Sequence, residues 1–83
     1  MITVRYFSWV RERMNRAEEA VTPPAGVNTV GELIGWLLGR DDVADLGIEP
    51  RLLKAAVDAR LADHGAPLAG ARVVALFPPM TGG

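Results

Sequence analysis

The chain has 83 residues, of which 49% are hydrophobic and 23% charged, a composition typical of one small globular domain. It contains no cysteine, which excludes a disulfide, a thiolate nucleophile and a cysteine metal site. A net charge of −1 without a basic block argues against nucleic-acid binding. With no long apolar run and no secretory signal pattern, we expect no membrane contact and a cytoplasmic location.

The first part of the chain predicts two strands on either side of a short helix. Residues 2–7 alternate with a period of two, which places Val4 and Tyr6 on one face and Phe7 on the other. The expected elements are a strand over 2–7, a short amphipathic helix over 9–14 and a second strand over 17–21, before the Pro-Pro-Ala-Gly break at 23–26.

The clearest helix begins after Thr29. Thr29 and Glu32 have the spacing of a capping box, and Gly39 is placed to end the helix. The apolar stripe of this helix, with Trp36 on its flank, consists of Val30, Leu33, Ile34, Leu37 and Leu38. Gly31 and Gly35 lie off this stripe, and close approach of another chain segment is one explanation for them.

The second half of the chain predicts three further strands. Residues 53–57 favour a strand, although Lys54 and the two alanines after it would equally suit a helix. A turn at residues 58–59 leads into a short strand over 60–62, and the apolar run 72–77 predicts a central strand. Two strands, one main helix and three more strands indicate an α+β domain, with a mixed sheet of about five strands and the helix across one face.

The alternation of the strands also predicts an exposed apolar face. If Val4 and Val74 face the helix, Phe7 and Phe77 share the opposite side of the sheet, and Leu61 joins them from the short strand. Such a cluster is a candidate partner surface. Arg11, on the exposed side of the short helix, is a further candidate contact.

Other polar residues suggest no separate site. His64 is the only histidine and is expected in a surface loop, and Lys54 is expected to be a solvated charge. Asp41, Asp42 and Asp45 lack the regular ligand spacing of a calcium loop, so we predict no metal site.

The C-terminus has the strongest chemical signal. Pro78 and Pro79 have no N–H to donate, so the sheet ladder must stop and residues 78–83 leave the domain 1–77 as an extended arm of roughly 20 Å. Gly82 and Gly83 could enter a tunnel too narrow for a side chain, and Gly83 ends in an ionised carboxylate. That carboxylate can attack ATP, become an acyl-adenylate and then accept sulfur. The residues expected to thread the arm into a partner are Pro78, Pro79, Met80, Thr81 and Gly82.

The ending Phe-Pro-Pro-Met-Thr-Gly-Gly, residues 77–83, resembles the Phe-Pro-Pro-Val-Thr-Gly-Gly ending of the small subunit of molybdopterin synthase. Residues 2–7 and the Val-Arg-Glu at 10–12 are similar to the first strand and following turn of that family. Residues 52–58 are similar to its Leu-Leu-Ala-Ala-Val-Asn segment, with one inserted residue and Asp58 in place of Asn. Residues 15–28 and 40–50 match weakly.

This resemblance implies a ubiquitin-like β-grasp fold and a sulfur-carrier role in molybdenum cofactor biosynthesis. An E1-like adenylyltransferase would use ATP to adenylate Gly83, and a sulfur donor enzyme would convert it to a thiocarboxylate, a C-terminal 1-thioglycine. The tail would then enter the large subunit, in a heterotetramer, and donate sulfur to cyclic pyranopterin monophosphate. The catalytic side chains would belong to that large subunit, and the small subunit would bind no cofactor.

Two alternatives remain open. A sulfur carrier for thiamine or cysteine synthesis would share the fold and the Gly-Gly end, although the Phe-Pro-Pro sequence favours the molybdopterin carrier. A non-covalent ubiquitin-like adaptor would bind partners through its sheet and would never activate its carboxylate.

Overall fold

The computed structural model describes residues 1–43 and 47–79. Its elements are β1 (Ile2–Tyr6), α1 (Ser8–Met14), β2 (Glu18–Val21), α2 (Val30–Leu38), the 3-10 turns η1 (Asp41–Val43) and η2 (Pro50–Leu52), β3 (Lys54–Val57), β4 (Arg60–Ala62) and β5 (Val73–Phe77). Every predicted strand is present, and the segment that would equally suit a helix forms β3. In the described part of the chain, no helix is long and apolar enough to cross a membrane.

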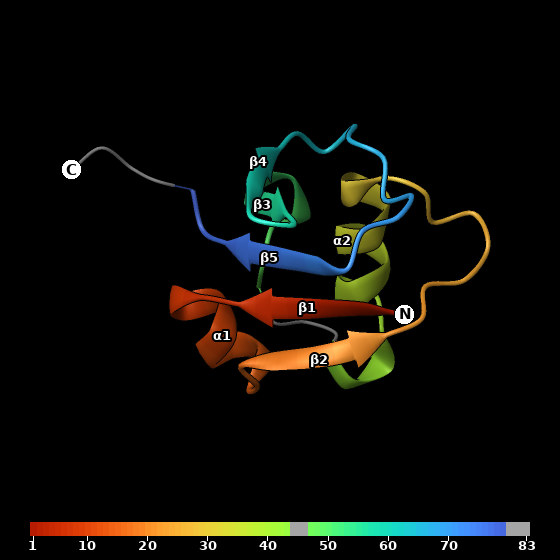
Figure 1. Cartoon of the computed structure of the whole chain (residues 1–83). Coiled ribbons are helices and arrows are strands. Elements are labelled where there is room, and N and C mark those ends of the chain that lie inside the picture. The colour runs from red at the N-terminus through yellow and green to blue at the C-terminus, as the bar shows by residue number, and fades with distance from the viewer. Residues whose placement is uncertain (44–46, 80–83) are drawn as a thin grey trace.

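The five strands form one mixed sheet in the order β2-β1-β5-β3-β4. β1 and β5 run parallel, whereas β1–β2, β3–β4 and β3–β5 are antiparallel. Helix α2 crosses one face of this sheet, and α1 lies beside the end of β1 (Figure 1). The predicted α+β architecture, with a mixed sheet, a central last strand and one main helix, is therefore confirmed.

The core lies between the sheet and α2. Val4 is paired with Val74 and Tyr6 with Leu76 across the β1–β5 ladder, and these four side chains are buried. The apolar stripe of α2 covers them, with Val30, Leu33, Ile34 and Leu37 fully buried. The alternation read from the sequence therefore assigned the core side of both strands correctly.

A reciprocal cap fixes the start of α2. The Thr29 Oγ1 accepts a hydrogen bond from the Glu32 amide at 3.2 Å, and the Glu32 Oε1 accepts one from the Thr29 amide at 3.1 Å. The Asn28 amide also donates to Glu32 Oε1, and this bond is the main cause that lowers the pKa of the Glu32 carboxyl. The predicted capping box is confirmed.

One of the two unexplained helix glycines is accounted for by a close approach of the chain itself. The Gly31 amide donates to the His64 carbonyl at 2.8 Å, and a Cβ at Gly31 would lie 3.2 Å from that oxygen. The His64 ring, half-buried rather than at the surface, places its Nε2 2.7 Å from the Leu53 carbonyl oxygen. The loop containing His64 thus links α2 to the start of β3. Nothing in the structure explains Gly35, beside which a Cβ would meet open space.

The hairpin between β3 and β4 turns through two residues in the left-handed region. Asp58 has φ 48° and Ala59 has φ 71°, a conformation that Asp tolerates and Ala rarely adopts. The Asp58 Oδ1 accepts hydrogen bonds from the backbone amides of Arg72, at 3.1 Å, and Val73, at 3.0 Å. The predicted turn is confirmed, and its carboxylate also fixes the start of β5.

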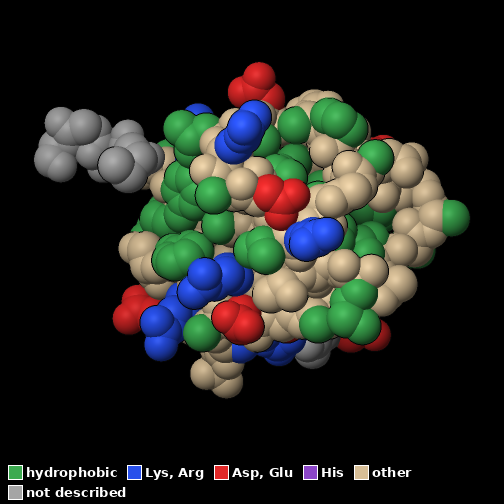
Figure 2. All heavy atoms as spheres, in the orientation of Figure 1, with side chains coloured by type: hydrophobic (Ala, Val, Ile, Leu, Met, Phe, Trp, Pro, Cys, Tyr) green, Lys and Arg blue, Asp and Glu red, His purple; other side chains and the backbone are tan. Residues whose placement is uncertain are grey.

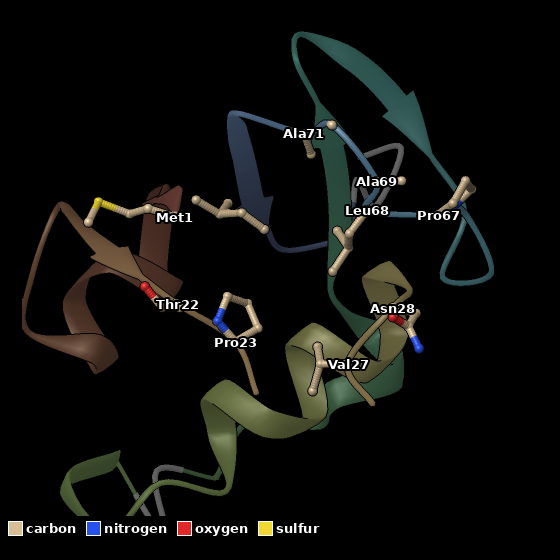
Figure 3. A pocket seen from close by; sticks show the side chains of 11 residues that line it. Met1, Thr22, Pro23, Val27, Asn28, Pro67, Leu68, Ala69 and Ala71 are labelled. Carbon is tan, nitrogen blue, oxygen red and sulfur yellow. The ribbon is translucent and has the colours of Figure 1, made fainter. Parts of the chain in front are cut away.

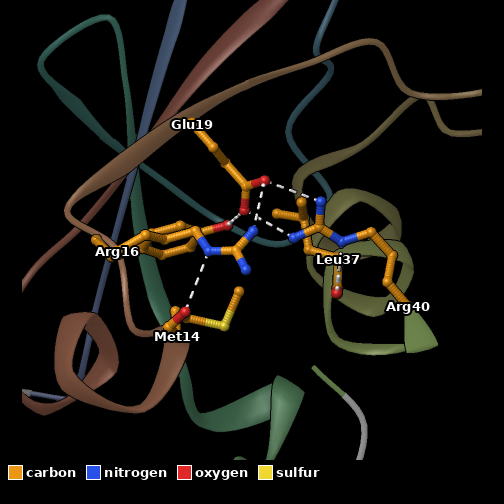
Figure 4. Close-up of polar contacts among 6 residues, drawn as sticks. Met14, Arg16, Glu19, Leu37 and Arg40 are labelled. Atoms are coloured by element: carbon orange, nitrogen blue, oxygen red, sulfur yellow. Dashed lines mark hydrogen bonds and ion pairs between the residues drawn. The ribbon is translucent and has the colours of Figure 1, made fainter. Parts of the chain in front are cut away.

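A charged cluster ties β2 to both helices (Figure 4). The Glu19 carboxylate accepts hydrogen bonds from the Arg40 guanidinium at 2.9 and 2.7 Å, from Arg16 at 3.1 Å and from the Tyr6 hydroxyl at 2.6 Å. Arg40 in turn donates to the Leu37 carbonyl at the end of α2. Because a two-pronged Arg–carboxylate pair is charge-assisted and directional, the cluster holds the C-terminal end of α2 against the edge of the sheet.

The same contacts shift the ionisation of two residues. The hydrogen bond from Arg40 is the main cause that lowers the pKa of Glu19 from 4.5 to about 2, against the opposing effect of burial. Burial, together with the hydrogen bond to Glu19, raises the pKa of Tyr6. Glu19 is therefore bound as the carboxylate, and it holds fewer protons in the folded chain than in the unfolded one at mildly acidic pH.

This cluster predicts an acid-dependent loss of stability. Since the pKa of Glu19 is lowered on folding, its contribution is complete above pH 4.5 and is lost as the pH falls toward 2. We expect the free energy of unfolding in urea to fall by about 2 kcal/mol from this residue across that interval, with allowance for its partial solvent contact.

The variant Glu19→Gln should be less stable at pH 7 and should show a smaller loss on acidification. Glu49→Gln, which alters an exposed pair with Arg51, serves as the matched control and should change stability by less than about 0.5 kcal/mol. Equal acid sensitivity of the parent chain and Glu19→Gln would contradict the assignment.

Candidate functional site

The end of β5 is where the chain leaves the sheet. Phe77 is the last residue of β5 and is paired with Lys54 of β3. Pro78 and Pro79 follow outside any strand, as predicted from their missing amide donors. Figure 1 shows the chain departing from the β5 tip away from α2. Met80, Thr81, Gly82 and Gly83 lie outside the described residues, so their threading role and the chemistry at Gly83 remain predictions.

The side of the sheet away from α2 forms an open face. Its strand residues follow from the register: Thr3, Arg5, Glu18, Ala20, Val73, Ala75, Phe77, Lys54, Ala56 and Leu61. Phe7 continues this alternation beyond β1, with an extended backbone and its amide bonded to the Leu76 carbonyl at 3.1 Å. No helix covers this face in Figure 1, and Figure 2 shows hydrophobic side chains gathered over β3, β4 and the end of β5.

The structure places three of the four predicted partner residues on the open face. Phe7 is 42% exposed and Leu61 is 82% exposed, while Phe77 is half-buried at the end of β5, which lies between β1 and β4 in the sheet. Arg11 is exposed on α1, where it borders a shallow depression with Ser8, Trp9 and Glu12. It therefore lies beside the sheet rather than on it. Binding of a partner by these residues remains a prediction.

Arg5 is a member of the open face that the sequence analysis did not single out. Its guanidinium lies 5.6 Å from the centre of the Phe7 ring and forms a 3.6 Å ion pair with Glu18. Both charged side chains are more than half exposed, so the pair itself adds little stability. Its effect is to hold a cation over one side of the Phe7 ring.

A hollow opens beside the point where β5 ends. It is lined by Lys54 and Ala55 of β3, Leu61 and Ala62 of β4, Asp63 and Phe77. Its apolar lining comes from Ala55, Leu61, Ala62 and Phe77, and Lys54 and Asp63 supply charges of opposite sign. The sequence did not reveal this hollow, because its assembly depends on β3 being a strand paired with both β4 and β5.

A second hollow lies at the opposite end of β1 and β5 (Figure 3). It is formed by three separate segments: the start of β1, residues 22–28 and residues 67–71. Thr22 and Asn28 are the polar side chains among its lining residues, so no lining side chain can act as an acid or base near neutral pH. In residues 1–43 and 47–79, no group of three or more His, Asp or Glu could hold a metal ion.

Comparison with known proteins places the chain among ubiquitin-like carriers. The model of the ThiS family matches residues 4–83. The chain is similar to the structure of a putative molybdopterin converting factor, subunit 1, from Pyrococcus furiosus, with 23% identity, coverage of 95% of this chain and 97% of that one, and a TM-score of 0.70. It is equally similar to SAMP1 from Haloferax volcanii, with 24% identity, coverage of 99% and 98%, and a TM-score of 0.70. No curated protein matches the chain.

These structural likenesses show the fold. Nearly the whole chain superposes on nearly the whole of both structures, so the ubiquitin-like β-grasp fold expected from the resemblance is confirmed. At this level of identity they do not carry the function of either protein to this chain.

Neighbouring residues of β5 face opposite sides of the sheet, so substitutions at Phe77 and Leu76 should affect different properties, binding and stability respectively. Phe77→Ala should weaken binding to a large subunit of molybdopterin synthase by about 2 kcal/mol or more if Phe77 is an anchor. Leu76→Ala, one residue away on the buried side, should instead lower the free energy of unfolding by about 2–5 kcal/mol. Calorimetric titration and urea unfolding measure the two effects. Unchanged affinity in Phe77→Ala would move the interface elsewhere.

Proposed function

We propose, on the premise that the chain belongs to the ThiS family of ubiquitin-like sulfur carriers, that it is the sulfur-carrier small subunit of a molybdopterin synthase. The observation that carries this proposal is the ending at residues 77–83, in which a central strand runs into two prolines and then Met-Thr-Gly-Gly. The similarity of the fold to a putative molybdopterin converting factor subunit is compatible with this choice of pathway.

The geometry at the end of β5 suits a carrier. β5 is paired on both sides, with β1 and with β3, so the point of departure of the tail is rigid. The two prolines limit the conformations of the first tail residues, which reduces the entropy lost when a partner orders the tail. A stiff base and a side-chain-free end favour delivery of a terminal carboxylate into a narrow active site.

The chemistry needs only the terminal carboxylate of this chain. A carboxylate oxygen of Gly83 attacks the α-phosphorus of ATP, pyrophosphate leaves, and an acyl-adenylate forms. A sulfide equivalent from a sulfur donor enzyme then attacks the acyl carbon and displaces AMP, which leaves a thiocarboxylate on Gly83. In the large subunit the thiocarboxylate sulfur attacks a carbon of cyclic pyranopterin monophosphate and displaces an oxygen substituent from it. Water then hydrolyses the acyl–sulfur bond, which leaves the sulfur on the pterin and returns the Gly83 carboxylate.

The side chains that catalyse these steps belong to partners in this proposal. An E1-like adenylyltransferase binds ATP, and the large subunit binds the pterin in a heterotetramer with two copies of each subunit. The open face is the surface that both partners cover, because it adjoins the departure point of the tail and exposes Phe7 and Leu61. Since one face serves both partners, their binding is mutually exclusive.

A sulfur carrier for thiamine synthesis is the second candidate. The ThiS family also covers thiamine carriers, and the fold and the Gly-Gly ending are compatible with this role. The Phe-Pro-Pro sequence at residues 77–79 favours the molybdopterin carrier. Reconstitution with each pathway distinguishes the two, because only the cognate acceptor enzyme takes sulfur from the loaded chain.

Deletion of Gly83 tests the proposal. The shortened chain should keep its melting temperature, because the described buried core is formed by residues between Ile2 and Leu76. The shortened chain should not support molybdopterin formation in an assay with the large subunit, the E1-like enzyme, ATP and a sulfur donor. Its terminal carboxylate lies one residue short of the reaction position.

A chain extended by one alanine after Gly83 is the matched control for length. It should fold normally and should also be inactive, since the reactive carboxylate now lies one residue too far. Full activity of either variant would overturn the sulfur-carrier proposal and would favour a non-covalent adaptor.

A further inference from the structure

We infer that Lys54 selects the partner: the surface of the large subunit that covers Phe77 presents a carboxylate to the Lys54 ammonium, beside an apolar side chain that fills the neighbouring hollow. This inference rests on the proposed function and assigns the chemistry of one part of its interface. Lys54 is the only lysine of the chain.

The β3–β5 register places Lys54 directly beside Phe77. The two residues are directly opposite in the antiparallel ladder, and the next residues along, Ala55 and Leu76, are also opposite and are buried on the core side. Lys54 and Phe77 therefore project from the same face, with Cβ atoms about 4.5–5.5 Å apart. A protein that covers the Phe77 ring must also cover at least the stem of Lys54.

The charge of Lys54 has no partner within the described chain. No hydrogen bond or ion pair joins its side chain to residues 1–43 or 47–79, and Asp63, on the same hollow, lies beyond ion-pair distance. Arg5, the other cation of the open face, is by contrast paired with Glu18. An ammonium that is covered without a counter-charge loses its hydration without compensation, so an interface over Phe77 is favourable when the partner supplies a carboxylate.

The hollow beside Lys54 defines the second part of the match. In the strand order, Leu61 and Ala62 of β4 lie on one side of β3 and Phe77 of β5 on the other, so an apolar side chain from the partner would meet apolar groups on both sides. Leu61 is 82% exposed and gains the most burial from such a contact. The pairing of an apolar anchor with a carboxylate excludes partners with a basic or purely apolar surface at this position.

Three variants and one matched control test the inference against the large subunit of molybdopterin synthase from the same genome. Lys54→Met keeps the unbranched stem and removes the charge, Lys54→Arg keeps the charge, and Lys54→Glu reverses it. Arg60→Met removes a cation from the same hairpin but from the opposite side of the sheet, since Arg60 is paired with Val57, which is opposite the buried Val74. Binding is measured by calorimetric titration at about 50 mM and about 500 mM salt.

We expect Lys54→Met to bind about tenfold more weakly than the parent chain at the lower salt concentration, and Lys54→Glu to bind more weakly still. The affinity of Lys54→Met should also depend less on salt, a change that a purely structural role of Lys54 would not produce. Lys54→Arg should bind within about threefold of the parent chain, and Arg60→Met should match the parent chain at both salt concentrations.

Equal affinity and equal salt dependence of Lys54→Met and the parent chain would overturn this inference and leave the proposed function intact. Tighter binding of Lys54→Met would overturn it as well, because it would show an apolar partner surface. Failure of the parent chain to bind the large subunit at all would overturn both the inference and the proposed function. Melting curves of all variants verify folding, and the exposed position of Lys54 predicts no loss of stability.

Discussion

The alternation of side chains along β5 is the constraint on which the site depends. Val74 and Leu76 point into the core and tie the strand to α2, so Ala75 and Phe77 must point to the open face. β5 is paired on both sides, and its last residue therefore has a fixed position and orientation. The two prolines that follow end the strand pairing, so the chain leaves the sheet at that point. Core packing, the partner surface and the origin of the tail are thus set by five consecutive residues.

Polar contacts at the margins of the sheet keep this platform rigid. The Glu19 cluster joins β2 to the end of α2. The Asp58 carboxylate accepts a hydrogen bond from the amide of Val73, the first residue of β5. The loop containing His64 links α2 to the residue before β3, because the His64 carbonyl accepts a hydrogen bond from the Gly31 amide and the His64 ring contacts the Leu53 carbonyl. A chain of this size has a small core, so such directional contacts contribute a large share of the specificity of the fold.

Periodicity and local chemistry were sufficient to predict the strands, the capped helix and the outward side of each strand, because each of these depends on residues close together in sequence. The Glu19–Arg40 pair spans 21 residues and carries no local signal, and Gly31 is explained by a loop that reaches it only in the folded chain. The segment beginning at Lys54 was ambiguous because alanine-rich runs suit a helix as well as a strand. The hollow beside Phe77 was missed because it forms only where β3 pairs with both β4 and β5. The role assigned to Gly83 came from the chemistry of a terminal carboxylate and from the resemblance of the tail, and it remains a proposal.

The mass of the intact chain tests the central claim most directly. The chain is co-expressed with the E1-like adenylyltransferase and the sulfur donor enzyme of its own genome, purified without reductant and examined by mass spectrometry. A sulfur carrier acquires a thiocarboxylate, which raises the mass by about 16 Da because sulfur replaces one oxygen, and fragmentation places the change on Gly83. A chain of unchanged mass, in a preparation where the adenylyltransferase consumes ATP with it, would contradict the account.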